Sequence, residues 1–336
     1  MNHFSRPILV GMDGGSTKTR LIVSDSTGHV LGRAAGGPSN CGLFEMSRLV
    51  DNFDGMFEEA ARQSGTQVLD VVYLGSAGVN RASDFSTLEA IIRKTSSVSL
   101  GKVCVDTDAM IGLAGGLCRD SGVVLIAGTG SVCFGRSPLG KTWQTGGREY
   151  LVDDRGSAYR IALEGLIAAV RSADRRGQVT ALEGTFFELL GISTPSEIVS
   201  RLHYPRAAET LVDKTYLAGL APYVFSCALS GDGVASAIID REVNELIHMV
   251  DVVVRQLEWT ESEVPLVLIG SVANRPEIRQ TIASRLRQIN PTLRILDPIL
   301  SPEGGALLLA AKLAGVQTGP AFVANVRDGE FSKSVL

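Results

Sequence analysis

Two apolar runs within residues 8–25 are separated only by a short turn rich in glycine and hydroxyl groups. This pattern predicts an antiparallel strand hairpin whose tight turn exposes backbone N–H groups. Glycines permit close backbone approach and hydroxyls are hydrogen-bond donors, so the turn suits a phosphate group. The residues expected to contact phosphate are Gly14, Gly15, Ser16, Thr17, Lys18 and Thr19.

Asp13 ends the first apolar run and would repel a bare phosphate. Its position is reasonable if a cation such as Mg²⁺ lies between the carboxylate and the phosphate, so Asp13 is the expected metal-binding residue. The pair Lys18-Thr19 also resembles the end of the phosphate loop that precedes a helix. Thr17 stands before that lysine and strand-forming residues follow, so we reject this motif. An ordinary glycine-rich hairpin with a solvated acid is the alternative.

The size and charge of the chain limit the number of domains and the kinds of partner that we expect. A chain of 336 residues exceeds the usual size of one hydrophobic core, so two domains are expected. A net charge of −4 and a pI near 5.7 provide no broad basic surface, so we expect no nucleic-acid partner. No apolar run has the length of a signal peptide core or a membrane span, so we expect a cytoplasmic protein without a membrane partner. A homodimer is compatible with the sequence.

The cysteines are odd in number and show no close paired spacing. They therefore indicate neither a disulfide framework nor a zinc or iron–sulfur site. These residues are Cys41, Cys104, Cys118, Cys133 and Cys227.

Hydrophobic periodicity predicts that strands and helices alternate after the hairpin. Gly65 is expected to end the first helix. A three-strand meander followed by strand–helix alternation predicts an α/β layer with a mixed sheet. The expected elements are strands at 29–34, 71–75 and 103–105 and helices at 43–64, 83–94 and 109–117.

A second hairpin of the same kind is predicted at residues 123–135, with the turn Gly128-Thr129-Gly130-Ser131. Its likeness to the first suggests that the chain contains two versions of one domain. A dinucleotide-binding fingerprint is the competing interpretation. We reject it because the third glycine is absent and strand-forming residues follow.

The rest of the chain contains two further loops of interest. Residues 146–158 form a loop dense in glycine and charge, which is typical of a ligand-binding loop. A strand at 265–269 opens into the loop 270–274, before a helix that starts at Pro276. Helices are expected at 159–173, over much of 181–229, at 239–257 and from about residue 301 to the last apolar run.

These three glycine and hydroxyl turns, with an acid ending the strand before the second, resemble the sugar kinase, actin and Hsp70-type ATPase superfamily over nearly the whole chain. Residues 13–19 are similar to its first phosphate motif and residues 128–131 to its second. Gly270-Ser271-Val272 resembles the adenosine motif of the N-acetylglucosamine kinase branch, in the BadF/BadG/BcrA/BcrD ATPase family. The resemblance also implies that Asn274 contacts adenosine.

The resemblance implies two ribonuclease H-like, actin-like ATPase domains with mixed sheets and a cleft between them. The first is expected at residues 1–118 and the second at 119–300. A last helix near 303–315 can pack back on the first domain.

The resemblance also implies a catalytic base, because Thr107-Asp108-Ala109 matches the segment that carries it in sugar kinases of this branch. A carboxylate at a strand end can take the proton from a sugar hydroxyl as its oxygen attacks the γ-phosphorus of ATP. Asp106 is the near competitor. Asp108 could also cap a helix that begins at Ala109, which is compatible with the catalytic role because a cap would fix the geometry of the side chain.

The sugar-binding residues implied by the family are Asn40, Asp108, Thr129, Arg148, Glu149 and Asp154. In residues 146–150 the chain has Gly-Gly-Arg-Glu-Tyr, similar to bacterial glucosamine-specific kinases, where other members have Gly-Gly-Trp-Gly. A carboxylate facing the ammonium of glucosamine contributes about 1.5–3 kcal/mol, which an acetamide cannot use. Alternatively, Glu149 pairs with Arg148 or Arg155 and never meets the sugar.

We therefore expect an ATP-dependent, Mg²⁺-requiring kinase that phosphorylates the 6-hydroxyl of glucosamine. N-acetylglucosamine or N-acetylmuramic acid is the alternative substrate. A nucleotide-hydrolysing switch or sugar sensor is the alternative of another class, but only seven residues precede the first strand and leave no room for a DNA-binding helix pair. The dehydratase activators of the same family have cysteines that this chain lacks near Ala127.

Overall fold

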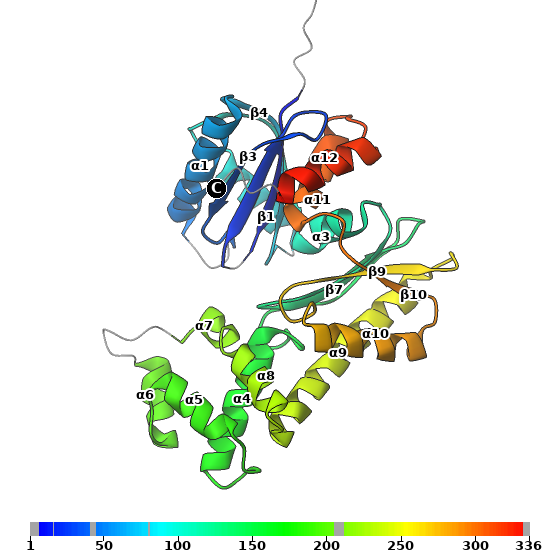
Figure 1. Cartoon of the computed structure of the whole chain (residues 1–336). Helices are drawn as coiled ribbons and strands as arrows, with labels where there is room; N and C mark the ends of the chain where they lie inside the picture. The colour runs from blue at the N-terminus through cyan, green and yellow to red at the C-terminus, as the bar shows by residue number, and fades with distance from the viewer. Residues whose placement is uncertain (1–6, 16, 41–44, 80, 205–211, 332–336) are drawn as a thin grey trace, which may run out of the picture. The chain divides into compact units, whose positions relative to one another are not determined.

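The computed structural model describes residues 7–15, 17–40, 45–79, 81–204 and 212–331. The chain forms two compact units, each assembled from separate segments (Figure 1). Unit 1 comprises Met1–Val124, Arg136–Lys141 and Leu296–Leu336, and unit 2 comprises Leu125–Gly135 and Thr142–Ile295.

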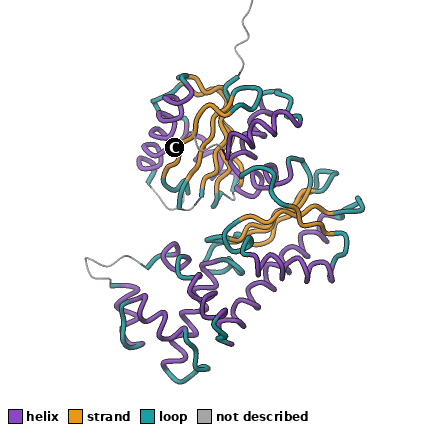
Figure 2. Tube along the Cα trace, viewed as in Figure 1, coloured by secondary structure: helices purple, strands orange, loops and turns teal. Residues whose placement is uncertain are grey.

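Strands and helices alternate over residues 30–127 and 233–313, whereas only helices occur among the described elements from 158 to 257 (Figure 2). The strands are β1 (Leu9–Gly14), β2 (Thr19–Ser24), β3 (Val30–Gly36), β4 (Val68–Ser76), β5 (Ser99–Thr107), β6 (Gly122–Ala127), β7 (Ser131–Arg136), β8 (Thr142–Gly146), β9 (Val264–Ile269) and β10 (Leu293–Leu296). The helices are α1 (Met46–Ser64), α2 (Ala82–Ile92), α3 (Asp108–Leu117), α4 (Ala158–Ala173), α5 (Leu182–Leu190), a 3₁₀ turn η1 (Pro195–Glu197), α6 (Ile198–His203), α7 (Lys214–Ala218), α8 (Ala221–Leu229), α9 (Gly233–Leu257), α10 (Pro276–Ile289), α11 (Pro302–Leu313) and α12 (Pro320–Phe331).

The sheet of unit 1 has the order β3-β2-β1-β4-β5. β1, β2 and β3 form the predicted antiparallel meander, whereas β4 runs parallel to β1 and β5 runs parallel to β4. Gly14, Ser76 and Thr107 lie abreast in neighbouring strands. The carboxyl ends of the three parallel strands therefore share one edge of the sheet. The predicted mixed sheet is confirmed.

Each face of this sheet has its own hydrophobic core. Val10 and Met12 of β1 pack in one core with residues of α1 and α2 such as Phe53, whereas Leu9 packs in the other core with residues of α11 and α12. Figure 1 shows α1 on one side of these strands and α11 and α12 on the other. Side chains alternate along a strand, so Asp13 points to the same side as Leu9, toward α11.

Unit 2 repeats the strand order of unit 1. Its sheet has the order β10-β9-β6-β7-β8, which matches β5-β4-β1-β2-β3 position by position. The prediction that the chain contains two versions of one domain is confirmed, because both predicted glycine turns join the first two strands of their sheets.

Unit 2 differs from unit 1 by its helices. A helical segment, α4–α8, precedes the long helix α9, which packs on β8, α8 and α10. The side chain of Asp232 caps the first turn of α9 by accepting a hydrogen bond from the N–H of Ala235 at 2.9 Å. The helices expected in residues 181–229 are confirmed for the described part of that range.

The structure corrects one helix start. α3 begins at Asp108, and its N-cap is Thr107, whose hydroxyl accepts from the N–H of Met110 at 3.2 Å. The interpretation of Asp108 as the cap of a helix that begins at Ala109 is wrong. Asp108 instead occupies the first turn, where the helix dipole favours an ionised carboxylate.

Candidate active site

The first glycine turn is held tightly within unit 1. Its turn closes through the Gly15 N–H, which donates to the Lys18 carbonyl at 2.9 Å. A Cβ on Gly14 would overlap with the Ser39 hydroxyl, so only glycine fits there. Thr17 and Lys18 are exposed at the turn, whereas Thr19 is fully buried. Ser16 lies outside the described residues.

The Thr19 hydroxyl already has a partner in the fold, because it donates to the Gly37 carbonyl at 2.7 Å. Thr19 also pairs with Gly14 and Gly36 within the sheet, so neither its hydroxyl nor its backbone is open to a phosphate in this structure. The next residues along the chain also contact the turn, since the Ser39 N–H donates to the Gly15 carbonyl at 3.2 Å. Asn40 follows, and a Cβ on Gly78 would overlap with its amide.

Three carboxylates interact electrostatically at the carboxyl end of β1: Asp13, Asp108 and Glu303. Burial first, and then the charges of Glu303 and Asp108, raise the pKa of Asp13 to about 7 against the opposing effect of Arg20 and Lys18. Arg20 lies directly opposite Asp13 in the hairpin. A cation would relieve the repulsion within this group.

Sequence reasoning missed Glu303. It occupies the first turn of α11, where an acid is expected for helix stability alone. The sequence feature that could have revealed Glu303 is the helix predicted near 303–315, because its return to the first domain would bring its first turn toward β1.

The fold separates Asp106 from Asp108. The Asp106 carboxylate accepts from the Tyr73 hydroxyl at 2.9 Å and from the N–H of Thr107 at 2.7 Å. One oxygen of Asp108 accepts from the N–H of Ala109 at 2.9 Å. Asp106 is therefore bound to a neighbouring strand, whereas Asp108 lies with the acids near the glycine turn.

In unit 2 the second glycine turn and the loop after β9 are in contact. Gly270 has a φ of +102°, and a Cβ there would overlap with the Ala127 carbonyl. The Val272 N–H donates to that same carbonyl at 2.9 Å, and the Asn274 N–H donates to the Gly270 carbonyl at 3.1 Å. The structure thus brings together Gly128 and the predicted adenosine loop, including Ser271.

The loop 146–158 joins the same cluster through Asp154. The Ser131 N–H donates to Asp154 at 3.1 Å, and the Ser131 hydroxyl donates to the Arg155 carbonyl at 2.7 Å. A Cβ on Gly130 would lie 3.0 Å from the Asp154 carboxylate. The Ala158 N–H donates to the Gly128 carbonyl at 2.8 Å, so both ends of the turn Gly128–Ser131, which contains Thr129, are tied to this loop.

Asp154 is only 4% exposed and has a left-handed φ of +58°. Its second oxygen accepts from the Lys214 ammonium at 2.7 Å. Lys214 also lies over the Tyr150 ring, at 5.2 Å from its centre. Sequence reasoning missed Lys214, because α7 follows Asp154 by sixty residues and carries no motif.

Glu149 is exposed and has a φ of +100°, which is uncommon outside glycine. Its carboxylate accepts from the N–H of Tyr150 at 2.9 Å. Arg155 pairs instead with the buried Glu242 at 2.9 Å, so the proposed Arg155–Glu149 pair is absent from the described part of the chain. The N–H of Arg148 donates to Asp153 at 3.1 Å.

Comparisons with known proteins agree with this arrangement. A family model for the BadF/BadG/BcrA/BcrD ATPase family matches residues 10–310. The chain belongs to this family. No described helix of this family member is long and apolar enough to cross a membrane.

Among curated proteins, the chain is 29% identical over 305 residues to the N-acetylmuramic acid/N-acetylglucosamine kinase of Clostridium acetobutylicum, with 90% of this chain and 97% of that protein covered. It is 27% identical over 313 residues to Glucosamine kinase GspK of Vibrio cholerae, with 90% and 95% covered. A solved structure from Chromobacterium violaceum, provisionally described as an N-acetylglucosamine kinase, has a TM-score of 0.72 at 22% identity and covers 91% of this chain and 99% of that one. This likeness shows the sugar-kinase, actin-like ATPase fold.

Proposed function

We propose that this chain is an ATP-dependent kinase that transfers a phosphoryl group to a hydroxyl of an amino sugar. The observation that carries the proposal is that relatives named as amino-sugar kinases align with 90% of the chain. The structure supplies compatible chemistry, because the residues that resemble the motifs of the family form two glycine turns and an acid in the first turn of a helix.

We infer that Asp108 is the catalytic base. Its place in the first turn of α3 stabilises the ionised carboxylate, which can then accept the proton of the sugar hydroxyl. The competing Asp106 already accepts the Tyr73 hydroxyl and is a poorer acceptor for substrate.

The glycine turns would bind the phosphates of ATP through backbone N–H groups and the exposed Thr17 and Lys18. Among the described residues no three metal-ligating side chains gather closely enough to hold an ion by themselves, so Mg²⁺ would be held by one or two carboxylates near Asp13 together with several waters, as this ion usually is. Bound Mg²⁺ would neutralise charge that develops on the transferred phosphoryl group. Asp13 would hold this ion through water, and the charge of the ion would add to that of Lys18 and Arg20 in favouring the ionised carboxylate.

We propose glucosamine as the preferred sugar, phosphorylated at the 6-hydroxyl. The support is that Glu149 is exposed and makes no ion pair with Arg155, so its carboxylate can meet an ammonium. N-acetylglucosamine is the second candidate, because the relative from Clostridium acetobutylicum is named for N-acetylmuramic acid and N-acetylglucosamine. For either sugar, we expect Asn40 and Asp154 to contact ring hydroxyls.

An ADP-release assay over a panel of amino sugars, with and without Mg²⁺, tests the proposal. We expect release to require both an amino sugar and Mg²⁺, and to be fastest with glucosamine. Release at the same rate without any sugar would overturn the kinase assignment. Faster turnover of N-acetylglucosamine would overturn only the preference assigned to Glu149.

A matched pair of variants tests whether Glu149 sets the preference for glucosamine. Glu149→Gln should lower kcat/KM for glucosamine by roughly ten- to hundred-fold and leave that for N-acetylglucosamine nearly unchanged, because only the ammonium loses a charged partner. Asp153→Asn changes a neighbouring acid of the same loop and should alter both sugars equally.

A further inference from the structure

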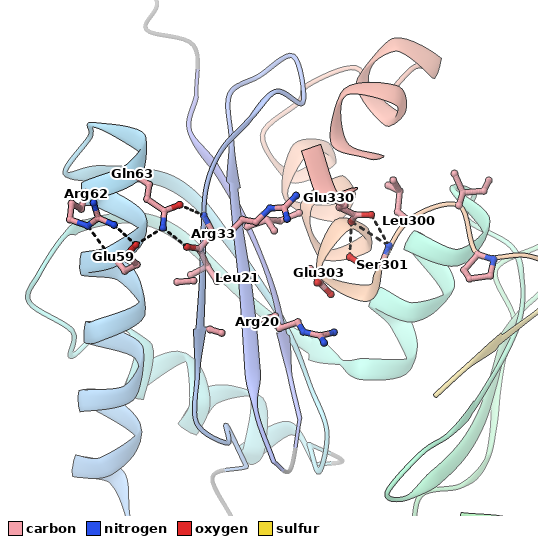
Figure 3. A pocket seen from close by; sticks show the side chains of 15 residues that line it. Arg20, Leu21, Arg33, Glu59, Arg62, Gln63, Leu300, Ser301, Glu303 and Glu330 are labelled. Atoms are coloured by element: carbon pink, nitrogen blue, oxygen red, sulfur yellow. Dashed lines mark hydrogen bonds and ion pairs between the residues drawn. The ribbon is translucent and has the colours of Figure 1, made fainter. Parts of the chain in front are cut away.

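A cavity of about 810 Å³ lies within unit 1 and extends from Arg20, beside the first glycine turn, along β2 and β3 (Figure 3). Its walls come from β2, β3, the end of α1, the segment 298–303 and Glu330 of α12. The volume is in the range of pockets for small molecules, and most of the lining is apolar. No motif described above accounts for this space.

Arg33 of β3 is positioned rigidly at this cavity. Its backbone N–H donates to the Gln63 side chain at 2.8 Å, and the Gln63 amide donates back to the Arg33 carbonyl at 2.9 Å. The Nε and Nη2 atoms of Arg33 are nevertheless buried and have no hydrogen-bond acceptor in the described part of the chain. Burying a guanidinium without acceptors is costly, so these donors call for a partner.

The opposite wall of the cavity has a buried hydrogen-bond acceptor that also lacks a partner. The Oε2 atom of Glu303 is buried and has no hydrogen-bond donor among the described residues. Figure 3 shows Arg33 on the strand side and Glu303 on the helix side of the same space. An unmatched donor group and an unmatched acceptor thus line one cavity.

Glu330 is the nearest candidate partner for Arg33, but its carboxylate is used elsewhere. Its two oxygens accept from the Ser301 hydroxyl at 2.6 Å and from the Ser301 N–H at 3.1 Å. A Cβ on Gly304 would overlap with Glu330, so the helix start is shaped around this contact. Arg62, at the rim, is paired with Glu59. Arg33 and Arg20 make no close ion pair of this kind in the described chain, although the charge of Arg33 acts on Glu330 and that of Arg20 acts on Asp13.

We propose that this cavity binds a small hydroxylated oxyanion, a carboxylate or a phosphate ester, with its oxyanion on Arg33 and a hydroxyl donated to Glu303. Arg20, which also lines the cavity, adds a second positive charge. The apolar walls fit the carbon skeleton of such a ligand. The site adjoins the Asp13 cluster, because Arg20 lies opposite Asp13 in the hairpin and Glu303 belongs to that cluster. Arg33 has no part in the proposed kinase reaction, so its variants test this site alone.

Calorimetric titration of the full chain tests the proposal with three probes: gluconate, glucose 6-phosphate and the neutral methyl glucoside. We expect gluconate or glucose 6-phosphate to bind, and which one binds distinguishes a carboxylate from a phosphate ester. Arg33→Met should weaken binding by roughly ten- to hundred-fold, because it removes charge-assisted hydrogen bonds and keeps the aliphatic stem. Arg62→Met, which removes an arginine of the same rim that is already paired, should change it by less than about twofold.

Arg33→Lys is the second variant, in case Arg33→Met does not fold. It keeps the charge but loses the planar pair of donors, so it should weaken binding to an intermediate degree. Equal binding of the neutral glucoside, no binding by any probe, or unchanged binding in both Arg33 variants would each overturn the proposal.

Discussion

Asp106 and Asp108 stand two residues apart, yet the fold gives their carboxylates different surroundings. Asp106 ends a strand and accepts from Tyr73 of the neighbouring strand, whereas Asp108 begins a helix. The proposed difference in their roles follows from these partners. It can be tested by changing each acid to its amide.

Asp108→Asn should lower kcat by about 10²–10⁴-fold, because an amide cannot take the sugar proton. The dissociation constant for ATP should stay within about twofold, since Asp108 is assigned to the sugar and not to the nucleotide. Asp106→Asn is the matched control and should retain most activity. The assignment fails if the Asp106 variant, and not the Asp108 variant, loses turnover.

Asp13 should make the stability of the protein depend on pH when nucleotide and metal are absent. Its pKa is raised from 3.8 to about 7, mainly by burial, so the folded state keeps a proton that the unfolded state loses within that window. The free energy of unfolding should therefore fall as the pH rises from about 4 to 7. At 1.36 kcal/mol per pH unit the loss reaches about 4 kcal/mol.

Urea denaturation of Asp13→Asn measures this effect. The variant should be more stable than the parent at pH 8 and equal to it at pH 4. Asp25→Asn should act in the opposite direction at pH 8: burial alone would raise the pKa of Asp25, but hydrogen bonds from Thr27 and His29 hold it below its usual value. Equal stability of the Asp13 variant and the parent at pH 8 would contradict the effect of burial.

Lys214 should stabilise unit 2 through its ion pair with Asp154. Lys214→Met leaves a carboxylate that is only 4% exposed without its cation, and should lower the free energy of unfolding by about 2–3 kcal/mol. Arg255→Met, which breaks the more exposed pair with Asp251, should cost less than about 1 kcal/mol. Urea denaturation compares the two, and equal losses would mean that burial of Asp154 does not matter.

At the scale of elements, helices α3 and α11 cross through glycine. A Cβ on Gly305 would overlap with the Ile111 carbonyl and with the backbone of Gly115. The two helices can therefore approach closely only where a side chain is absent. This contact positions the first turn of α11, and hence Glu303, on the same side of the sheet as Asp13.

Gly305→Ala should therefore destabilise the protein by more than about 3 kcal/mol, because backbone on both sides must move. Gly184→Ala, within α5, meets nothing within 4 Å and should instead stabilise by about 0.5–1 kcal/mol. Thermal unfolding of both variants measures the contrast. A Gly305 variant as stable as the parent would show that the helices can separate without loss.

Local patterns predicted most of the elements, because the two glycine turns and Gly65 act over a few residues. The predicted cap of α3 was wrong. Whether Thr107 or Asp108 caps the helix depends on backbone angles, which cannot be read from the spacing of residues in the sequence. Glu303 and Lys214 reach the candidate site through contacts distant in sequence. Their neighbours form no motif, so only the fold reveals them.

At the scale of the whole molecule, the two units have separate sheets. Differential scanning calorimetry without ligands should therefore give a calorimetric enthalpy greater than the van't Hoff enthalpy, because more than one cooperative transition contributes. Equal enthalpies would show that the units unfold together.

The packing of α11 on β1 also means that unit 1 cannot finish folding until late in synthesis on the ribosome. The strands of unit 1 emerge first, and Ile111 of α3 covers part of the face with Leu9 and Ile22, but the rest is covered only when Pro302–Leu313 has been made. Synthesis from the end of β5 to the end of α11 takes roughly 10–40 s at 5–20 residues per second, and this face stays incompletely covered for that time. Unit 2 can complete its sheet during this delay, so the nascent first unit should be the one that a chaperone protects.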